Sequence, residues 1–265
     1  MKILAIGDPH GDLEKVKRIP IKNIDLILLT GDLGKADFAR KHFFDNLKRK
    51  QNGLQEKEYT KSEIRKVYKE IYNSSISILK YLSKFAPVYS IFGNVGADNS
   101  ETRKNERKYK TKLPPLISGI NGVKNVYLID NKLRNFSGVK IGGVEYFVDN
   151  SWVKEFQEED KKIIKEAKRE TEKAKKVLNK FRHLDILLCH QPPYGFLDKV
   201  TSRYNPPKSW IGKHAGSKVI LDYIKKYQPR YVLCGHIHEG EGKKKIGKTE
   251  VYNLGIVGHV FFNIN

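Results

Sequence analysis

Five short apolar segments in this chain each end in a residue that can bind a metal ion or a phosphate. The segments are residues 3–6, 26–29, 88–92, 186–189 and 231–234. Short apolar runs rich in branched side chains are typical of strands that are buried on both faces. Because the carboxyl ends of neighbouring parallel strands meet at one edge of a sheet, the pattern predicts an α/β fold with a polar site along that edge.

The polar residues after these segments form an ordered series of short motifs. In chain order they are Asp8-Pro9-His10, Gly31-Asp32, Gly93-Asn94, His190 and Gly235-His236-Ile237-His238. Carboxylates, imidazoles and amide oxygens are ligands for divalent metals, and one carboxylate can bridge two ions. Asp32 is the candidate for the bridge, since Gly31 lets the backbone approach closely. The series predicts a dinuclear site with the ligands Asp8, His10, Asp32, Asn94, His190, His236 and His238.

Two lysine-rich segments, at about residues 35–84 and 154–182, interrupt the alternation of strands and helices. In the first, apolar residues recur at helical spacing along residues 64–82 and predict a long helix, after an earlier one that ends near Asn52-Gly53. The second predicts one long helix with a charged outer face. We expect a single domain over residues 1–265 with these segments as helical insertions.

Two shorter segments carry weaker signals. Residues 101–112 contain six Lys and Arg residues and no apolar stripe, which predicts an exposed loop. Residues 139–141 and 144–148 have strand character, and Gly142-Gly143 between them predicts a hairpin turn.

The formal net charge of +21 is the outlier of the composition. Such an excess attracts phosphate-bearing partners, so nucleic acid is a candidate ligand. In a second interpretation the lysines only solvate the insertion helices, and abundant Lys and Glu with few Met and Cys is also typical of a thermophile. Charge alone does not define a site, so both interpretations stay open at this point.

The two cysteines, Cys189 and Cys234, lie at the ends of predicted strands and form no Cys-x-x-Cys pair. They are expected to be buried free thiols and not a disulfide. We find no apolar stretch suited to a signal peptide, and none near the roughly 20 residues that a membrane span needs. A cytoplasmic protein without membrane contact is therefore expected, and the sequence carries no signal for an oligomeric state.

The ordered motifs resemble those of the calcineurin-like metallophosphoesterase superfamily. Its blocks Asp-x-His, Gly-Asp, Gly-Asn, a lone His and Gly-His-x-His occur here in order, over roughly residues 1–34, 88–98 and 184–258. The resemblance implies a four-layer α-β-β-α sandwich with two metal ions at the strand ends. It assigns one ion to Asp8, His10, Asp32 and His238, and the other ion to Asp32, Asn94, His190 and His236.

Residues 190–198, with the sequence His-Gln-Pro-Pro-Tyr-Gly-Phe-Leu-Asp, are most similar to the phosphodiesterase-type subgroup with a His-x-Pro-Pro-x-Gly block. Many members of the superfamily carry a His directly after the metal-binding Asn, where this chain has Val95. Valine cannot protonate a leaving oxygen, so another proton donor is needed, and His214 and His259 are the candidates, with His214 considered first. The departure argues against the nuclease and protein-phosphatase branches.

These features favour a metal-dependent phosphoesterase that hydrolyses phosphodiester bonds of a small or nucleotide-like substrate with a metal-bridged hydroxide. Asn94 and His190 are also candidate substrate contacts. The mixed ligand set suits Mn²⁺ best, with Fe, Zn²⁺ and Ni²⁺ as further candidates. Two alternatives stay open, a nuclease on polymeric nucleic acid and a non-catalytic, metal-containing binder of nucleic acid or phosphate.

Overall fold

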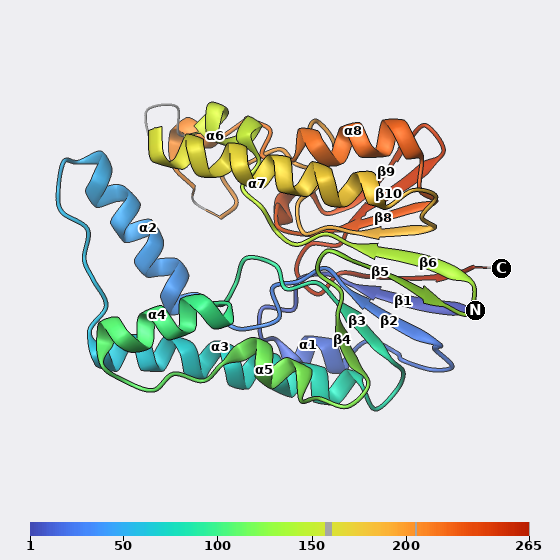
Figure 1. Cartoon of the computed structure of the whole chain (residues 1–265), viewed down its shortest axis with the longest axis horizontal. Coiled ribbons are helices and arrows are strands. Elements are labelled where there is room, and N and C mark those ends of the chain that lie inside the picture. The colour runs from blue at the N-terminus through green and yellow to red at the C-terminus, as the bar shows by residue number, and fades with distance from the viewer. Residues whose placement is uncertain (157–160, 205, 265) are drawn as a thin grey trace.

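The computed structural model describes residues 1–156, 161–204 and 206–264, and this part contains two β-sheets that pack face to face (Figure 1). The first sheet has five described strands in the order β11-β1-β2-β3-β4. β11 runs antiparallel to β1, and the remaining pairs are parallel. The strands are β1 (Lys2–Ile6), β2 (Leu26–Leu29), β3 (Val88–Ser90), β4 (Val126–Leu128) and β11 (His259–Asn263).

The second sheet has six described strands in the order β5-β6-β7-β8-β10-β9. Its central pairs β6-β7, β7-β8 and β8-β10 are parallel, and the two outer pairs are antiparallel. The strands are β5 (Lys132–Phe136), β6 (Val139–Gly143), β7 (Ile186–Leu188), β8 (Tyr231–Cys234), β9 (Gly242–Ile246) and β10 (Thr249–Asn253).

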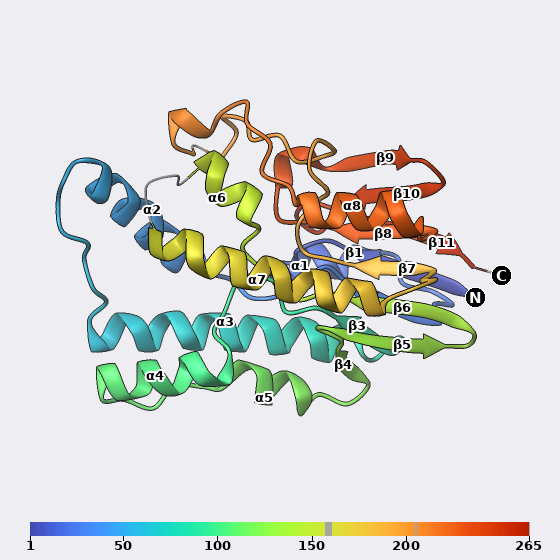
Figure 2. The same ribbon diagram turned by 45° about the horizontal axis from the view of Figure 1, so that its top comes forward.

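Helices cover the outer face of each sheet and complete four layers (Figure 2). One apolar cluster joins the first sheet to α1, α3 and α5, another joins the second sheet to α7 and α8, and a third lies between the sheets. The expected α-β-β-α fold class is therefore confirmed. The helices are α1 (Leu13–Lys17), α2 (Asp37–Gln51), α3 (Lys61–Leu82), α4 (Asn99–Tyr109), α5 (Leu116–Asn121), α6 (Asn150–Phe156), α7 (Lys161–Lys180) and α8 (Lys218–Tyr227).

β1 shows why the predicted strands are apolar throughout. Leu4 and Ile6 pack into the cluster under the helices, whereas Ile3 and Ala5 pack into the cluster between the sheets. Successive side chains of a strand point to opposite faces, so a strand with both faces covered needs an unbroken apolar run. The first polar residue after such a run stands at the sheet edge, where the carboxyl ends of the strands meet.

The hairpin predicted at Gly142-Gly143 is wrong, because both glycines lie inside β6. The turn falls instead at Ser137 and Gly138, which have positive φ angles of 50° and 88° and connect β5 to β6. Gly142 and Gly143 serve close packing, since a side chain at Gly143 would meet the carbonyl oxygen of Ile129 at 2.5 Å. The strand predicted over residues 144–148 is also absent from the described structure, where this segment has no regular secondary structure.

The exposed loop predicted at residues 101–112 is wrong as well, because most of it forms α4. Asp98 caps this helix by accepting a hydrogen bond of 2.7 Å from the backbone N–H of Glu101. Arg107 and Lys108 lie in the last turn, where cations interact favourably with the helix dipole. The cap at its start and the basic residues at its end stabilise this helix, although it has almost no apolar face.

The first insertion forms α2 and α3. The apolar stripe of α3 is buried as predicted, and the helix begins with a capping box between Thr60 and Glu63. α2 ends at Gln51, next to the predicted break, and buries none of its residues. It stands away from the two sheets in both overall views (Figure 2).

The second insertion forms two helices, α6 and α7, and not the one long helix that was predicted. Part of that prediction, residues 157–160, lies outside the described residues. Ala167, Ala174 and Leu178 on α7 are buried as expected. Cys189 and Cys234 are free and buried, as expected. None of the helices described is both long and apolar enough to span a membrane.

Candidate metal centre

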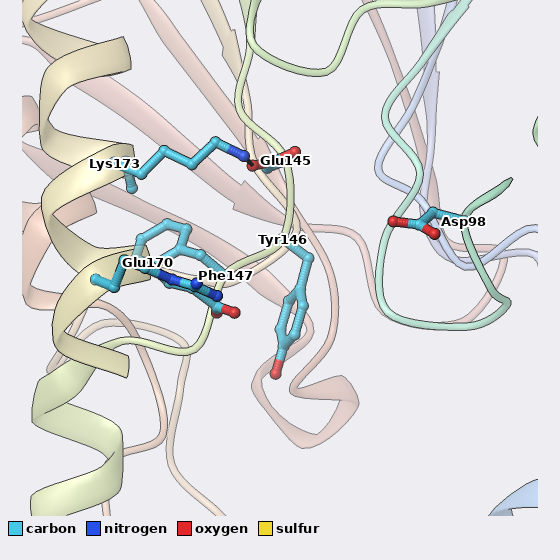
Figure 3. Close-up of a pocket in the computed structure, with 8 residues that line it drawn as sticks. Asp98, Glu145, Tyr146, Phe147, Glu170 and Lys173 are labelled. Atoms are coloured by element: carbon cyan, nitrogen blue, oxygen red, sulfur yellow. Dashed lines mark hydrogen bonds and ion pairs between the residues drawn. The ribbon is translucent and has the colours of Figure 1, made fainter. Parts of the chain in front are cut away.

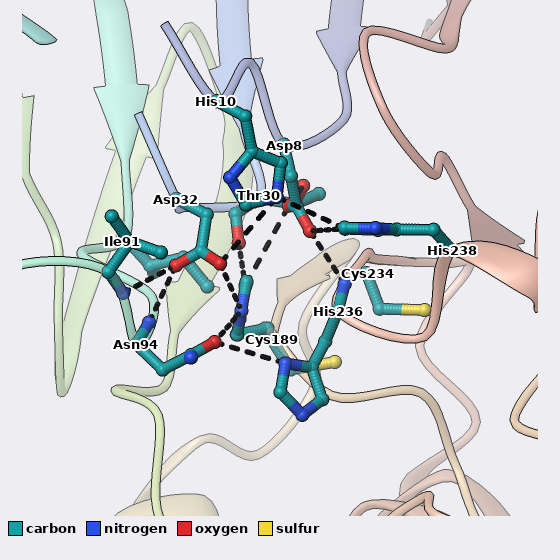
Figure 4. A network of polar contacts seen from close by, with 12 residues as sticks. Asp8, His10, Thr30, Asp32, Ile91, Asn94, Cys189, Cys234, His236 and His238 are labelled. Atoms are coloured by element: carbon teal, nitrogen blue, oxygen red, sulfur yellow. Dashed lines mark hydrogen bonds and ion pairs between the residues drawn. The ribbon is translucent and has the colours of Figure 1, made fainter. Parts of the chain in front are cut away.

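The polar residues of the sequence motifs lie together where the carboxyl ends of the parallel strands of both sheets meet (Figure 4). β1, β2 and β3 lead to this point from the first sheet, and β7 and β8 lead to it from the second. The contacts given below connect all seven predicted ligands: Asp8, His10, Asp32, Asn94, His190, His236 and His238.

Unusual backbone angles turn several of these side chains inward. His10, Asp32 and His236 have positive φ angles of 44°, 45° and 64°. Such angles are uncommon outside glycine, and they persist where the surrounding structure enforces them. Gly31 and Gly93 are required for a related reason, because a side chain at Gly31 would lie 2.8 Å from the Cα of Gly93 and one at Gly93 would collide with Asp32.

Asp8 is fully buried, and donors from two other elements hold its carboxylate. The Thr30 hydroxyl donates to Oδ1 at 2.7 Å, and the backbone N–H of His236 donates to Oδ2 at 2.6 Å. The Nε2 atom of His238 lies 3.3 Å from the same Oδ2. Burial raises the pKa of Asp8, but the charges and hydrogen bonds of nearby histidines outweigh burial, and the pKa falls below its usual value. Asp8 is therefore ionised, which is the form that a metal ligand needs.

Asp32 is held so that one oxygen is fixed and the other is available. Oδ1 accepts hydrogen bonds from the backbone N–H groups of Asn94 and Val95 at 2.7 and 2.8 Å. Oδ2 lies 3.3 Å from His190 Nε2 and 3.9 Å from His10 Nε2. Burial raises the pKa of Asp32, but the charges of the neighbouring histidines and a hydrogen bond from His190 together outweigh burial and hold the pKa well below its usual value.

His190 gives the clearest sign that a cation belongs here. Its Nδ1–H donates to the Thr30 carbonyl oxygen at 2.9 Å, which leaves a lone pair on Nε2. That Nε2 faces two oxygens, Asn94 Oδ1 at 2.6 Å and Asp32 Oδ2 at 3.3 Å. Burial lowers the pKa of His190, but the Asp32 and Asp8 carboxylates outweigh it and raise the pKa to about 9. The two carboxylates therefore favour a positive charge at His190, and a metal ion bound there would supply that charge in place of the proton.

The other three histidines present nitrogen atoms to the same space. His236 Nδ1 lies 3.0 Å from Asn94 Oδ1, and the Nε2 atoms of His10 and His238 lie 3.2 Å apart. Burial lowers the pKa of His10, and burial together with the His190 charge lowers the pKa of His236 to about 3. Neutral imidazoles are the form that binds metals, so the His10 and His236 rings are ready to act as ligands.

Two groups of atoms in the described residues have the spacing to hold an ion. Asp8, His10 and His238 form one group, and Asp8, Asp32 and His190 form the other. In each group the ligand atoms all lie within 4.8 Å of one another. Oxygen and imidazole donors of this kind suit divalent transition metals, so the residues present fit a metal centre.

The calcineurin-like phosphoesterase family matches residues 1–240 of the chain. The chain belongs to this family. Among curated proteins, Metallophosphoesterase domain-containing protein 1 of Homo sapiens and that of Mus musculus are each 38% identical to it over 74 residues. The matched region is 28% of this chain and spans only 20% of the length of either relative. One solved crystal structure, at 19% identity, covers 98% of this chain and 93% of its own with a TM-score of 0.58, which shows a shared fold.

Membership of the calcineurin-like phosphoesterase family agrees with the two groups of described residues that could hold a metal ion. At the position after Asn94, the side chain of Val95 packs against the apolar cluster under α3. The candidate proton donor His214 bonds through Nδ1 to Oδ1 of buried Asp198 at 2.7 Å. In the described structure, no hydrogen bond, ion pair or ring contact joins His214 to the seven predicted ligands.

Sequence reasoning missed three residues of the site. Only Thr30 carried a signal, because it places a hydroxyl at the end of a predicted strand, directly before Gly31-Asp32. Tyr146 lies beside His190 and His236, with ring centroids 5.8 and 5.4 Å apart. Tyr204 lies edge-on to His238, with ring centroids 5.7 Å apart. The two tyrosines come from segments where patterning predicts a strand or a loop.

Tyr146 also lines a cavity of about 360 Å³ beside the centre (Figure 3). Burial raises the pKa of the Tyr146 hydroxyl, which therefore stays protonated. The cavity is otherwise lined by charged and apolar side chains of the neighbouring segments and α7: Asp98, Glu145, Phe147, Arg169, Glu170, Lys173 and Ala174. Lys173 forms an ion pair with Glu145 across it. The cavity is thus polar and adjoins the side of the centre formed by His190 and His236.

Proposed function

We propose that this protein is a dinuclear metal-dependent phosphoesterase that hydrolyses phosphodiesters of a small or nucleotide-like substrate. The observation that carries the proposal is the convergence of seven donor side chains where the strands of both sheets end, among them His190, whose Nε2 lone pair faces two oxygen atoms. Two divalent cations there would activate a water molecule, orient it toward phosphorus and neutralise charge on the phosphate oxygens. The protein supplies the ligands and fixes their orientation.

One ion would be held by Asp8, His10, Asp32 and His238, and the other by Asp32, Asn94, His190 and His236. Asp32 suits the bridging role, because its free Oδ2 faces His10 and His190, which belong to different ions. Asp8 also lies near both groups. However, its Oδ1 already accepts the Thr30 hydroxyl and faces Nδ1 of His190 at 3.7 Å, and that nitrogen donates to the Thr30 carbonyl.

The proposed preference for diesters rests on the side chains that flank the centre on two sides. A diester carries two substituents, and tyrosines flank the centre both at His190 and His236 and at His238. The cavity at Tyr146 has room for one substituent, and the Tyr204 side offers a second surface. Val95 supplies no acid for a poor leaving group, so good leaving groups are favoured. Asn94 is exposed and would contact the substrate as well as an ion.

Metal-stripped protein tests the proposal when it is assayed on bis-p-nitrophenyl phosphate and p-nitrophenyl phosphate with Mn²⁺, Ni²⁺, Zn²⁺ or Mg²⁺ added. We expect restored turnover with Mn²⁺ above the other ions, and a higher kcat/KM for the diester. Asp32→Asn should be inactive with every metal, whereas Asp45→Asn, an exposed position on α2, serves as the matched control. A higher kcat/KM for the monoester would refute diester preference.

Nuclease activity on polymers is the second candidate, favoured by the net charge of +21. In this case single-stranded DNA or RNA would compete strongly with bis-p-nitrophenyl phosphate and would be cleaved. A protein that binds oligonucleotide but hydrolyses no activated ester with any metal would instead be a non-catalytic binder.

A further inference from the structure

One aromatic side chain links the centre to the first insertion. Tyr204 meets the His238 ring edge-on, with an interplanar angle of 83°. The guanidinium carbon of Arg40, on α2, lies 5.5 Å from the centroid of the Tyr204 ring. The guanidinium carbon of Arg203 lies at the same distance of 5.5 Å. Two cations therefore contact a ring that itself touches a predicted metal ligand.

Neither guanidinium group is paired with a carboxylate in the part of the chain that the structure describes, residues 1–156, 161–204 and 206–264. Lys35, which lies in the same insertion, differs because it pairs with both Asp37 and Glu70. Two like charges beside one ring repel each other, and a tyrosine face offsets this only in part.

The position of α2 agrees with a role at the centre. Although α2 buries no residue, it keeps a defined place, because His42 stacks on Tyr59 with ring centroids 3.9 Å apart. Arg40 and Phe44, one helical turn apart, are in contact at 5.8 Å, which holds the Arg40 side chain along the helix. A helix that buries none of its residues completely is thus fixed where it presents a cation toward the candidate metal centre.

We propose that Arg40 and Arg203 form an anion subsite that binds a second phosphate of the substrate. The inference rests on the proposed phosphodiesterase function and narrows its substrate class to esters with more than one phosphate. Paired guanidinium groups suit phosphate, since each can donate two parallel hydrogen bonds to its oxygens. The second phosphate comes either from a terminal phosphate of a short nucleotide or from the next backbone phosphate of a polymer.

Two thymidine dinucleotides that differ only by a 5′-phosphate test the subsite. Calorimetry of the Mn²⁺-loaded Asp32→Asn protein would measure binding without turnover, and kcat/KM of the active protein would be measured in parallel. We expect the 5′-phosphate to tighten binding, and Arg40→Gln with Arg203→Gln to lose about tenfold or more of that gain. Lys41→Gln, which removes an exposed charge from the same helix, should keep the gain.

Each result has a distinct meaning. Equal binding of the two dinucleotides, or an equal loss for both in the double variant, would overturn the subsite. A wild type that hydrolyses bis-p-nitrophenyl phosphate with no metal would instead overturn the proposed function. The double variant should keep kcat on that singly charged ester within about twofold. The reason is that the subsite lowers KM only for substrates that carry a second phosphate. A 12-nucleotide strand that outcompetes the phosphorylated dinucleotide would identify the polymer as the source.

Discussion

Asp32 is predicted to stabilise the metal-free protein through its fixed oxygen, independently of any metal. Oδ1 accepts two short hydrogen bonds from the backbone N–H groups of Asn94 and Val95, and the side chain is 3% exposed. Asp32→Asn keeps an acceptor oxygen for both donors, whereas Asp32→Ala leaves both without a partner. An unpaired buried donor costs about 1–3 kcal/mol, so Asp32→Ala should be less stable than Asp32→Asn by about 2–6 kcal/mol.

Urea unfolding in excess chelator measures this difference. The matched control is the pair Asp45→Ala and Asp45→Asn on the exposed face of α2, which should differ by less than about 1 kcal/mol. Both Asp32 variants should be inactive, so activity does not separate them. Equal free energies of unfolding for the two Asp32 variants would refute the claim that backbone N–H groups hold this carboxylate.

Three further predictions address the surroundings of the centre. Thr30→Val removes the hydroxyl that donates to Asp8, so metal affinity should fall about 10–100-fold in a metal-competition assay, and an unchanged affinity would argue against that role. Burial raises the pKa of Asp130 from 3.8 to about 6, so the folded protein is more stable while this carboxyl is protonated. That stability is lost as the pH rises through about 6. Asp130→Asn should remove this loss of about 3 kcal/mol, visible as a flatter melting-temperature profile between about pH 4 and 7, and a profile like that of the wild type would contradict it. Rates on aryl diesters should fall steeply with leaving-group pKa in the wild type and in His214→Gln alike, because Val95 supplies no acid. A flat dependence that becomes steep only in His214→Gln would assign the proton to His214.

The meeting of the predicted ligands could be anticipated from sequence because each of their motifs follows an apolar strand. Parallel strands bring their carboxyl ends to one edge of the sheet. The sequence therefore predicts that Asp8, Asp32 and Asn94 meet, even when no tertiary contact is known. The fold class follows from the same pattern, since apolar runs such as β1 require cover on both faces.

Other features depend on contacts that local patterning does not contain. α4 has almost no apolar face, and its helix is set by capping at Asp98. Gly142-Gly143 has the composition of a turn, but the glycines are needed for packing between Ile129 and the neighbouring strands. Tyr146 and Tyr204 lie on irregular segments, and only the tertiary fold brings them to the metal ligands.

Electron paramagnetic resonance on the Mn²⁺-loaded protein, with its bound ions counted, tests the central claim most directly. We predict two Mn²⁺ ions per chain whose spins are coupled, because the Asp32 carboxylate bridges them. Asp32→Asn should retain its fold and lose the coupled signal, whereas Lys41→Gln should keep it. One Mn²⁺ per chain, or two uncoupled ions in the wild type, would contradict a dinuclear centre bridged by Asp32.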